Sequence, residues 1–176
     1  ERLGLKCVYH AHISTGELHL RPVLNLKEEN DRVLFRRVAE ETAKLVKKHR
    51  GSLSGEHGDG RLRGEFIPLL FGEKVYGLMQ ETKACWDPEG IFNARKIVNT
   101  PPMDTSLRYE VGDSNVTCRT YFDFSKEKGW LCAIEQCNGS GDCRKSYAFG
   151  GTMCPSFRAT REESHTTRAR ANTLRE

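Results

Sequence analysis

The sequence of 176 residues lacks a long hydrophobic run: no apolar stretch approaches the roughly 18 residues of a membrane-spanning helix. Its mean hydropathy is −0.63. The charged N-terminal residues are followed by no apolar segment of the kind that a secretory signal peptide contains. Strong charge of one sign is also absent, because 28 Lys and Arg oppose 24 Asp and Glu, for a net charge of +4. We therefore expect a soluble protein with no membrane span and no nucleic-acid partner.

Cysteine is too sparse for a disulfide-rich secreted scaffold, since the chain has 7 cysteines, an odd number. We therefore expect a reducing compartment, with the protein in the cytoplasm or peripheral at the inner face of the membrane. Most of the cysteines fall in residues 118–154, whereas Cys7 and Cys85 stand alone. This clustering divides the chain into two parts of different chemistry.

The hydrophobic pattern of the first part predicts an α+β fold, with an antiparallel sheet and packed helices. Apolar and β-branched residues on both sides of a Ser-Thr-Gly turn predict a β-hairpin within residues 5–26. Apolar residues spaced three or four apart predict helices at residues 28–49 and about 72–85, the first of them ended by Gly51. Paired prolines without periodicity predict an extended linker from near Asn99 onward.

Two histidines and a glycine-rich loop form the first candidate site. His12 and His19 flank the predicted hairpin turn, so they can lie opposite each other on one face and share an ion, with Glu56 of the loop as third ligand. Three protein ligands would leave a position open for substrate, and the adjacent His57 could act as general base. On spacing alone, most histidine pairs seven residues apart are unrelated surface or half-buried residues, and His10 leaves open which imidazoles would bind.

Three segments carry a family resemblance: HAHISTGELHLRP, SGEHGDGRLRGEF and FNARKIV. In order and spacing they resemble the C-terminal part of FAD-linked oxidases of the vanillyl-alcohol-oxidase superfamily, in the branch of the D-lactate and D-2-hydroxyglutarate dehydrogenases. In that branch the hairpin usually reads H-x-G-D-G-N-L-H, which differs from this sequence in the turn. The resemblance covers residues 1–99 and implies a metal- and substrate-binding domain truncated at its N-terminus, with the FAD-binding domain upstream and this chain inactive alone.

Carried over by matching position, the resemblance implies that His12, His19 and Glu56 bind a divalent metal, Zn or Mn. It implies that His57 is the catalytic group. It also implies a flavin contact at Asn93, although an asparagine that supplies a turn explains this residue equally well.

Two arginines of the glycine-rich loop are candidates for substrate binding. Arg61 and Arg63 could pair with the second carboxylate of a substrate, or could be solvated loop residues.

The family pattern places a proline and a glycine directly after its F-N dipeptide, where this sequence has Ala94 and Arg95 after Phe92-Asn93.

The C-terminal part carries the cysteine segment C-NGSGD-C-RKSYAFGGTM-C-P at residues 137–155. With MCPSFRATREESHTTRARA, it resembles the ferredoxin-type iron–sulfur module of bacterial FAD/Fe–S dehydrogenases. The resemblance implies an iron–sulfur cluster, of 4Fe-4S type, held by Cys137, Cys143 and Cys154. Residues 100–125 would then be a linker and residues 126–176 the N-terminal part of a mainly helical iron–sulfur domain. A zinc knuckle and unrelated buried cysteines are the alternatives.

These patterns predict part of a flavin-dependent D-2-hydroxyacid dehydrogenase, of D-2-hydroxyglutarate or D-lactate type. We expect it to oxidise a 2-hydroxy acid to a 2-oxo acid and to pass electrons through FAD to iron–sulfur clusters. A quinone or a carrier protein would be the acceptor. The alternative is a non-catalytic module that binds metal for structure or interaction, and the sequence leaves the oligomeric state open.

Overall fold

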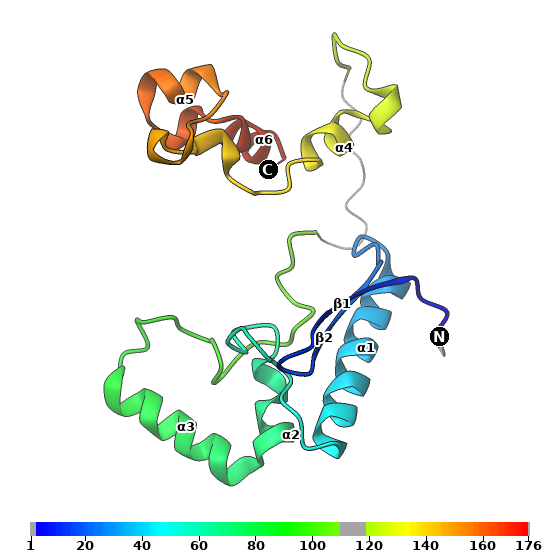
Figure 1. Cartoon of the computed structure of the whole chain (residues 1–176), viewed down its shortest axis with the longest axis vertical. Coiled ribbons are helices and arrows are strands. Elements are labelled where there is room, and N and C mark those ends of the chain that lie inside the picture. Colours follow the sequence, from blue (N-terminus) through cyan, green and yellow to red (C-terminus); the bar gives the residue numbers. More distant parts are fainter. Residues whose placement is uncertain (1–2, 110–118, 176) are drawn as a thin grey trace. The chain divides into compact units, whose positions relative to one another are not determined.

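The computed structural model describes residues 3–109 and 119–175 of the chain. It divides into two compact units, unit 1 (Glu1–Asp113) and unit 2 (Ser114–Glu176). Figure 1 shows the strands and helices of unit 1 and the short helices of unit 2. Within the described ranges, no helix combines the length and the apolar character that crossing a bilayer requires. The α+β class predicted from the sequence is confirmed.

The sheet of unit 1 is the predicted hairpin, formed by β1 (Cys7–His12) and antiparallel β2 (Glu17–Pro22). Its register differs from the prediction, because His12 pairs with Glu17, and His19 pairs with His10. The cause is the turn, whose four residues place Glu17 directly after the corner. Since paired residues share a face and alternate residues along a strand do too, both pairs lie on one face of the hairpin. The predicted sharing of a face is therefore confirmed.

The opposite face of the hairpin is apolar and largely exposed, since Tyr9, Leu18 and Leu20 are 65%, 70% and 46% exposed. Helix α1 (Glu29–Lys48) follows the hairpin in the chain. Tyr9 and Leu20 of the hairpin line one cavity of about 620 Å³ together with Val38 and Leu45 of α1. The alternation of side chains along the strands therefore separates an apolar face from a face that carries imidazoles.

Helix α1 closely matches its prediction. Acidic residues Glu29 and Asp31 occupy its first turn, and Lys47 and Lys48 occupy its last, which suits the helix dipole at both ends. The residue that leaves the helix in the left-handed region is Arg50, with φ of 55°, rather than the expected Gly51.

The core of unit 1 lies where α1 meets the segment that follows the glycine-rich loop. A short 3-10 helix (Gly64–Phe66) leads into α2 (Ile67–Phe71), and α3 (Glu73–Trp86) follows as predicted. Phe66 and Ile67 are almost fully buried. Gly64 is required by close packing, because a Cβ there would lie 2.2 Å from Cγ2 of Thr100 and 3.1 Å from the carbonyl oxygen of Ile97.

Residues 100–105 belong to the packed part of unit 1, whereas the sequence predicts an extended linker from residue 100. Met103 is only 1% exposed and joins the core. The guanidinium of Arg36, on α1, donates to both carboxylate oxygens of Asp104, with each nitrogen–oxygen distance 2.7 Å. These hydrogen bonds hold the pKa of Asp104 below its ordinary value. The packed part of unit 1 therefore extends at least to Thr105.

Unit 2 is built mainly from short helices, as expected. They include α4 (Trp130–Glu135), α5 (Pro155–Thr160) and α6 (Thr167–Arg175), joined by single turns of 3-10 helix. Helices α4 and α6 contact each other. Thr166, directly before α6, is fully buried, and its hydroxyl accepts from the N–H of Ala169 at 3.0 Å. This bond caps the N-terminus of α6.

Candidate metal and substrate site

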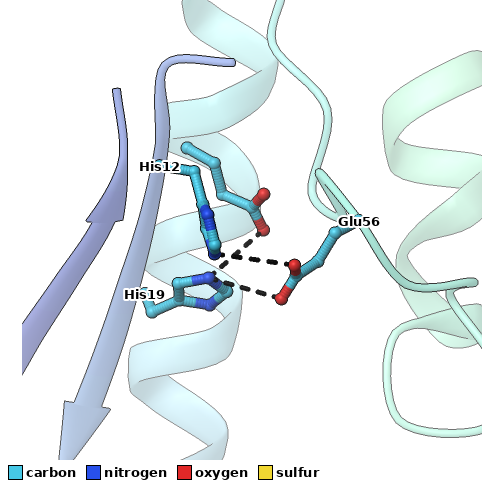
Figure 2. Close-up of side chains that lie close together, drawn as sticks. His12, His19 and Glu56 are labelled. Carbon is cyan, nitrogen blue, oxygen red and sulfur yellow. Dashed lines mark ion pairs between the residues drawn. The ribbon is translucent and has the colours of Figure 1, made fainter. Parts of the chain in front are cut away.

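Three predicted ligands converge on one point of unit 1 (Figure 2). His12, at the end of β1, places its Nε2 atom 3.6 Å from Oε2 of Glu56. His19, on β2, places its Nε2 atom 3.4 Å from Oε1 of the same carboxylate. Two imidazoles and a carboxylate at such distances are a donor set that suits divalent zinc or manganese. The arrangement brings together a hairpin and a loop that lie far apart in the sequence.

Glu17 is a fourth member of this cluster that the sequence motifs did not indicate. Each of the four residues His12, Glu17, His19 and Glu56 offers a ligand atom within 4.8 Å of the others. This is the single group of three or more potential ligands of this kind within residues 3–109 and 119–175. The period of two along a strand could have identified Glu17, because it lies two residues before His19 and therefore on the same face.

The glycine-rich loop approaches the hairpin most closely at Gly55. A Cβ at this position would lie 2.6 Å from Cδ of Glu17. Any side chain here would therefore displace the Glu17 carboxylate. Gly55 thus lets the loop bring Glu56 up to the histidines.

His57 lies beside the cluster, as predicted. Its Nε2 atom is 2.9 Å from Oε1 of Glu56, so the ring is oriented by a carboxylate that also faces His19. The side chain of His57 is 70% exposed. It is therefore open to a small molecule and fixed through one ring nitrogen.

A cavity of about 360 Å³ adjoins the cluster and separates the two predicted substrate arginines. Glu17, His19, His57 and Arg63 line it. Arg61 does not, because its guanidinium donates to the carbonyl oxygen and the hydroxyl of Thr105. Among the described residues, no partner holds the guanidinium of Arg63. The geometry therefore favours Arg63 over Arg61 as a ligand for an anion.

Asn93 lies away from the histidines, at a second cavity of about 790 Å³. Gly60 and Trp86 are among the other residues that line it. Asn93 has φ of 45°, a conformation that asparagine tolerates better than most residues. This geometry accommodates both sequence interpretations of Asn93, the turn and the cofactor contact.

The chain before Asn93 is anchored by Asp87, whose side chain is 4% exposed. Its carboxylate accepts from Lys83 at 2.6 Å and from the N–H groups of Ile91 and Phe92. The hydrogen bond from Lys83 is the largest cause that lowers the pKa of Asp87, and the two backbone N–H groups add to it.

Two of the three predicted cluster cysteines, Cys137 and Cys143, line one cavity of about 320 Å³ in unit 2. Burial raises the pKa of Cys143, but hydrogen bonds from the N–H of Arg168 and the hydroxyls of Thr167 and Thr166 outweigh it and lower that pKa overall. The first turn of α6 thus stabilises a thiolate at this position.

Cys154, the third predicted cluster ligand, does not line this cavity. It is buried, and its thiol lies 3.9 Å from the carbonyl oxygen of His165, to which it donates. Within the described part of the chain, no group of three or more cysteines has its sulfur atoms close enough to share a single ion.

The first unit and most of the chain have recognisable relatives. Residues 1–97 match the family model for the C-terminal domain of FAD linked oxidases. A D-2-hydroxyglutarate dehydrogenase of Pseudomonas putida is 35% identical over 181 residues, and one of Escherichia coli strain K12 is 30% identical over 173 residues. Each alignment covers 98% of this chain, and so includes both units, but only 17% of the relative.

A D-lactate dehydrogenase of Archaeoglobus fulgidus is 30% identical over 98 residues, which is 56% of this chain and 21% of that protein. No solved structure matches the chain. The chain thus corresponds to a small part of each of these longer enzymes.

Proposed function

Because this chain belongs to the FAD linked oxidases through their C-terminal domain, we propose that it forms the metal- and substrate-binding part of an FAD-dependent dehydrogenase acting on D-2-hydroxy acids. The observation that carries the proposal is the convergence of His12, His19 and Glu56 beside His57. The names of the relatives, D-2-hydroxyglutarate dehydrogenase and D-lactate dehydrogenase, support this substrate class. FAD, bound mainly by another domain, supplies the acceptor for the hydride that leaves the α-carbon.

The proposal assigns His12, His19 and Glu56 to a divalent ion, Zn or Mn. Such an ion lowers the pKa of a hydroxyl group bound to it. The three side chains come from two segments whose positions are set by the hairpin register and by Gly55. The positions of the three side chains therefore depend on the fold of both segments, which supports the proposal.

His57 accepts the proton of the substrate hydroxyl. When its Nε2–H donates to Oε1 of Glu56, the neutral ring carries its lone pair on Nδ1. The proton then moves to Nδ1 while the two electrons leave with the hydride, and the product is the 2-oxo acid. Glu56 stabilises the resulting imidazolium through the same contact.

Arg63 binds the carboxylate at the far end of the substrate. It lines the cavity that also contains His19 and His57, and its side chain is only half-buried there. A guanidinium binds a carboxylate through two parallel hydrogen bonds. This assignment favours D-2-hydroxyglutarate, which has a second carboxylate, over D-lactate. Arg61 then positions the loop through Thr105, and Asn93 contacts the flavin from the second cavity.

Calorimetric titration of the full chain tests the metal and substrate site. The chain should bind one Mn²⁺ or Zn²⁺, and D-2-hydroxyglutarate should bind only after the ion has been added. His12→Ala should abolish both events, and Arg63→Met should weaken D-2-hydroxyglutarate far more than D-lactate. His10→Ala is the matched control, because His10 lies on the same face of the hairpin but outside the ligand group.

The alternative is a non-catalytic module that binds metal for structure or interaction. A structural site has its coordination closed by protein and shows no dependence on a 2-hydroxy acid. Ion binding without any effect of D-2-hydroxyglutarate would therefore favour this alternative. Absence of ion binding by the folded chain would refute both.

For unit 2 we propose an iron–sulfur cluster, of 4Fe-4S type, that passes electrons from the flavin toward a quinone or a carrier protein. Cys137 and Cys143 supply thiolates to the cavity that they share, and the lowered pKa of Cys143 favours the thiolate there. Cys154, directly before Pro155, is assigned to a neighbouring cluster.

Anaerobic reconstitution with iron and sulfide tests this assignment. The chain should gain sulfide-dependent absorption and an electron paramagnetic resonance signal on reduction. Cys143→Ser should remove most of both, whereas Cys85→Ser, at an exposed position of α3, should change neither. Equal incorporation in the two variants would count against the assignment.

A further inference from the structure

Glu17 is a carboxylate held in the metal cluster with no hydrogen-bond donor. Its side chain is only 14% exposed, and Nε2 of His19 lies 3.8 Å from its Oε1, beyond hydrogen-bond length. Within the described residues, no N–H or O–H group donates to it. A carboxylate largely removed from water without a donor is costly unless a cation compensates it.

A second carboxylate increases the free-energy cost of holding Glu17 in this position. Glu17 and Glu56 both offer oxygens to the same group of atoms, all within 4.8 Å of one another. Two negative charges this close disfavour each other in a site partly shielded from water. A divalent cation between them neutralises both carboxylates, whereas an ion bound by Glu56 alone would leave Glu17 uncompensated.

The spacing of the four side chains fits a common ion. Ligand atoms about 2.1 Å from an ion lie roughly 3 to 4 Å apart, depending on the coordination geometry. The observed separations are 3.4 Å for His19 and Glu56, 3.6 Å for His12 and Glu56, and 3.8 Å for His19 and Glu17. The separation between Glu17 and His19 is therefore similar to the separations among the three ligands that the sequence predicted.

We infer that Glu17 is a fourth protein ligand and that it adapts the site to a six-coordinate ion such as Mn²⁺. This inference rests on the proposed function and assigns the ion within it. Four protein ligands close a tetrahedral zinc site, so no position would remain for substrate. A six-coordinate ion bound by the same four residues keeps two positions, which match the hydroxyl and the carboxylate of a 2-hydroxy acid.

Gly55 provides an independent way to disturb Glu17. A Cβ at Gly55 would occupy the place of the Glu17 carboxylate, because it would come within 2.6 to 2.9 Å of all three of its atoms. Gly55→Ala therefore moves this carboxylate without changing its charge, whereas Glu17→Gln removes the charge without changing its volume.

Mn²⁺ titration of the full chain, followed by water-proton relaxation, tests the inference. The wild-type chain should bind one Mn²⁺ with about two exchangeable waters, and Glu17→Gln should show about three. The affinity of Glu17→Gln should fall at least about tenfold, because the charge of the ligands strongly tunes the affinity of such sites. Gly55→Ala should show a similar loss, and Glu81→Gln, at an exposed position of α3, should match the wild type.

A second measurement compares the two ions. D-2-Hydroxyglutarate should bind the wild-type chain loaded with Mn²⁺ at least about tenfold more tightly than the chain loaded with Zn²⁺, because four protein ligands close the zinc site. Glu17→Gln should narrow this difference. Circular dichroism of each variant verifies that the chain is folded.

The outcomes separate the two proposals. If Glu17→Gln and Gly55→Ala both bind Mn²⁺ as the wild type does, with the same number of waters, Glu17 is not a ligand and the inference is overturned. The three-ligand site of the proposed function would then still stand. If the folded wild-type chain binds neither ion, the proposed function itself fails.

Discussion

Gly64→Ala should destabilise unit 1 by crowding the contact between the 3-10 helix and residues 97–100. The new Cβ would lie 2.2 Å from Cγ2 of Thr100, where two carbon atoms need about 3.5 Å or more. One of the two segments must therefore move by more than about 1 Å. Overpacking of this kind costs about 1 to 3 kcal/mol, and the entropy gained by replacing glycine offsets at most about 1 kcal/mol of it.

The measurement is differential scanning calorimetry of the full chain, with amide hydrogen exchange to assign the transition to unit 1. We expect the free energy of unfolding of unit 1 to fall by about 1 to 2 kcal/mol, which lowers its midpoint by several degrees. Thr100→Ala removes the clashing methyl group, so the double variant should recover at least about 0.5 kcal/mol relative to the sum of the single changes.

Gly58→Ala is the matched control for this prediction. A Cβ at Gly58 meets nothing within 4 Å, and its φ is not in the left-handed region. This substitution should be neutral or stabilise slightly. Equal losses of stability for Gly58→Ala and Gly64→Ala, or full additivity with Thr100→Ala, would refute the argument from close packing.

Three further predictions follow from single residues. Asp87 has a pKa below its ordinary value in the folded chain, so its contribution to stability is complete above the pKa of the unfolded chain, about 3.9. It is lost as pH falls through the folded pKa, and the difference in urea midpoint between wild type and Asp87→Asn should shrink over that range. Arg95→Gly should raise the free energy of unfolding by up to about 1 kcal/mol, because Arg95 has φ of 58°, whereas Arg95→Ala, which keeps a Cβ, should not. The pH dependence of the reaction of Cys143 with iodoacetamide, in the metal-free chain, should give an apparent pKa below about 8.5. Thr167→Val removes one of the hydrogen bonds to the thiolate and should raise that pKa. An unchanged pKa in this variant would show that the hydrogen bond from Thr167 does not form in solution.

The grouping of the candidate ligands was largely predictable because its signal in the sequence is local. The two histidines flank a turn, and Glu56 lies in a loop with a distinctive composition. The register was not predictable, because a hairpin with one residue more or less in its turn pairs different residues. Because the register was unknown, the sequence did not indicate Glu17, which joins the group only because it pairs with His12.

Long-range packing accounts for the other differences. The proline-rich sequence around Met103 and Asp104 shows no periodicity. Met103 nevertheless contributes to the core, and Asp104 binds Arg36, which lies on a helix far away in the sequence. Arg61 and Arg63 are equivalent in the sequence, two residues apart in one loop. The structure distinguishes them because only the guanidinium of Arg61 donates a hydrogen bond to Thr105.

The two-faced hairpin also constrains how this protein can vary in length. Deleting one residue inside β1 or β2 would invert the parity of that strand, moving an imidazole onto the apolar face and an apolar side chain into the polar cluster. Deleting two would preserve the parity. Deletions or insertions within these strands should therefore be tolerated in steps of two residues and rejected in steps of one.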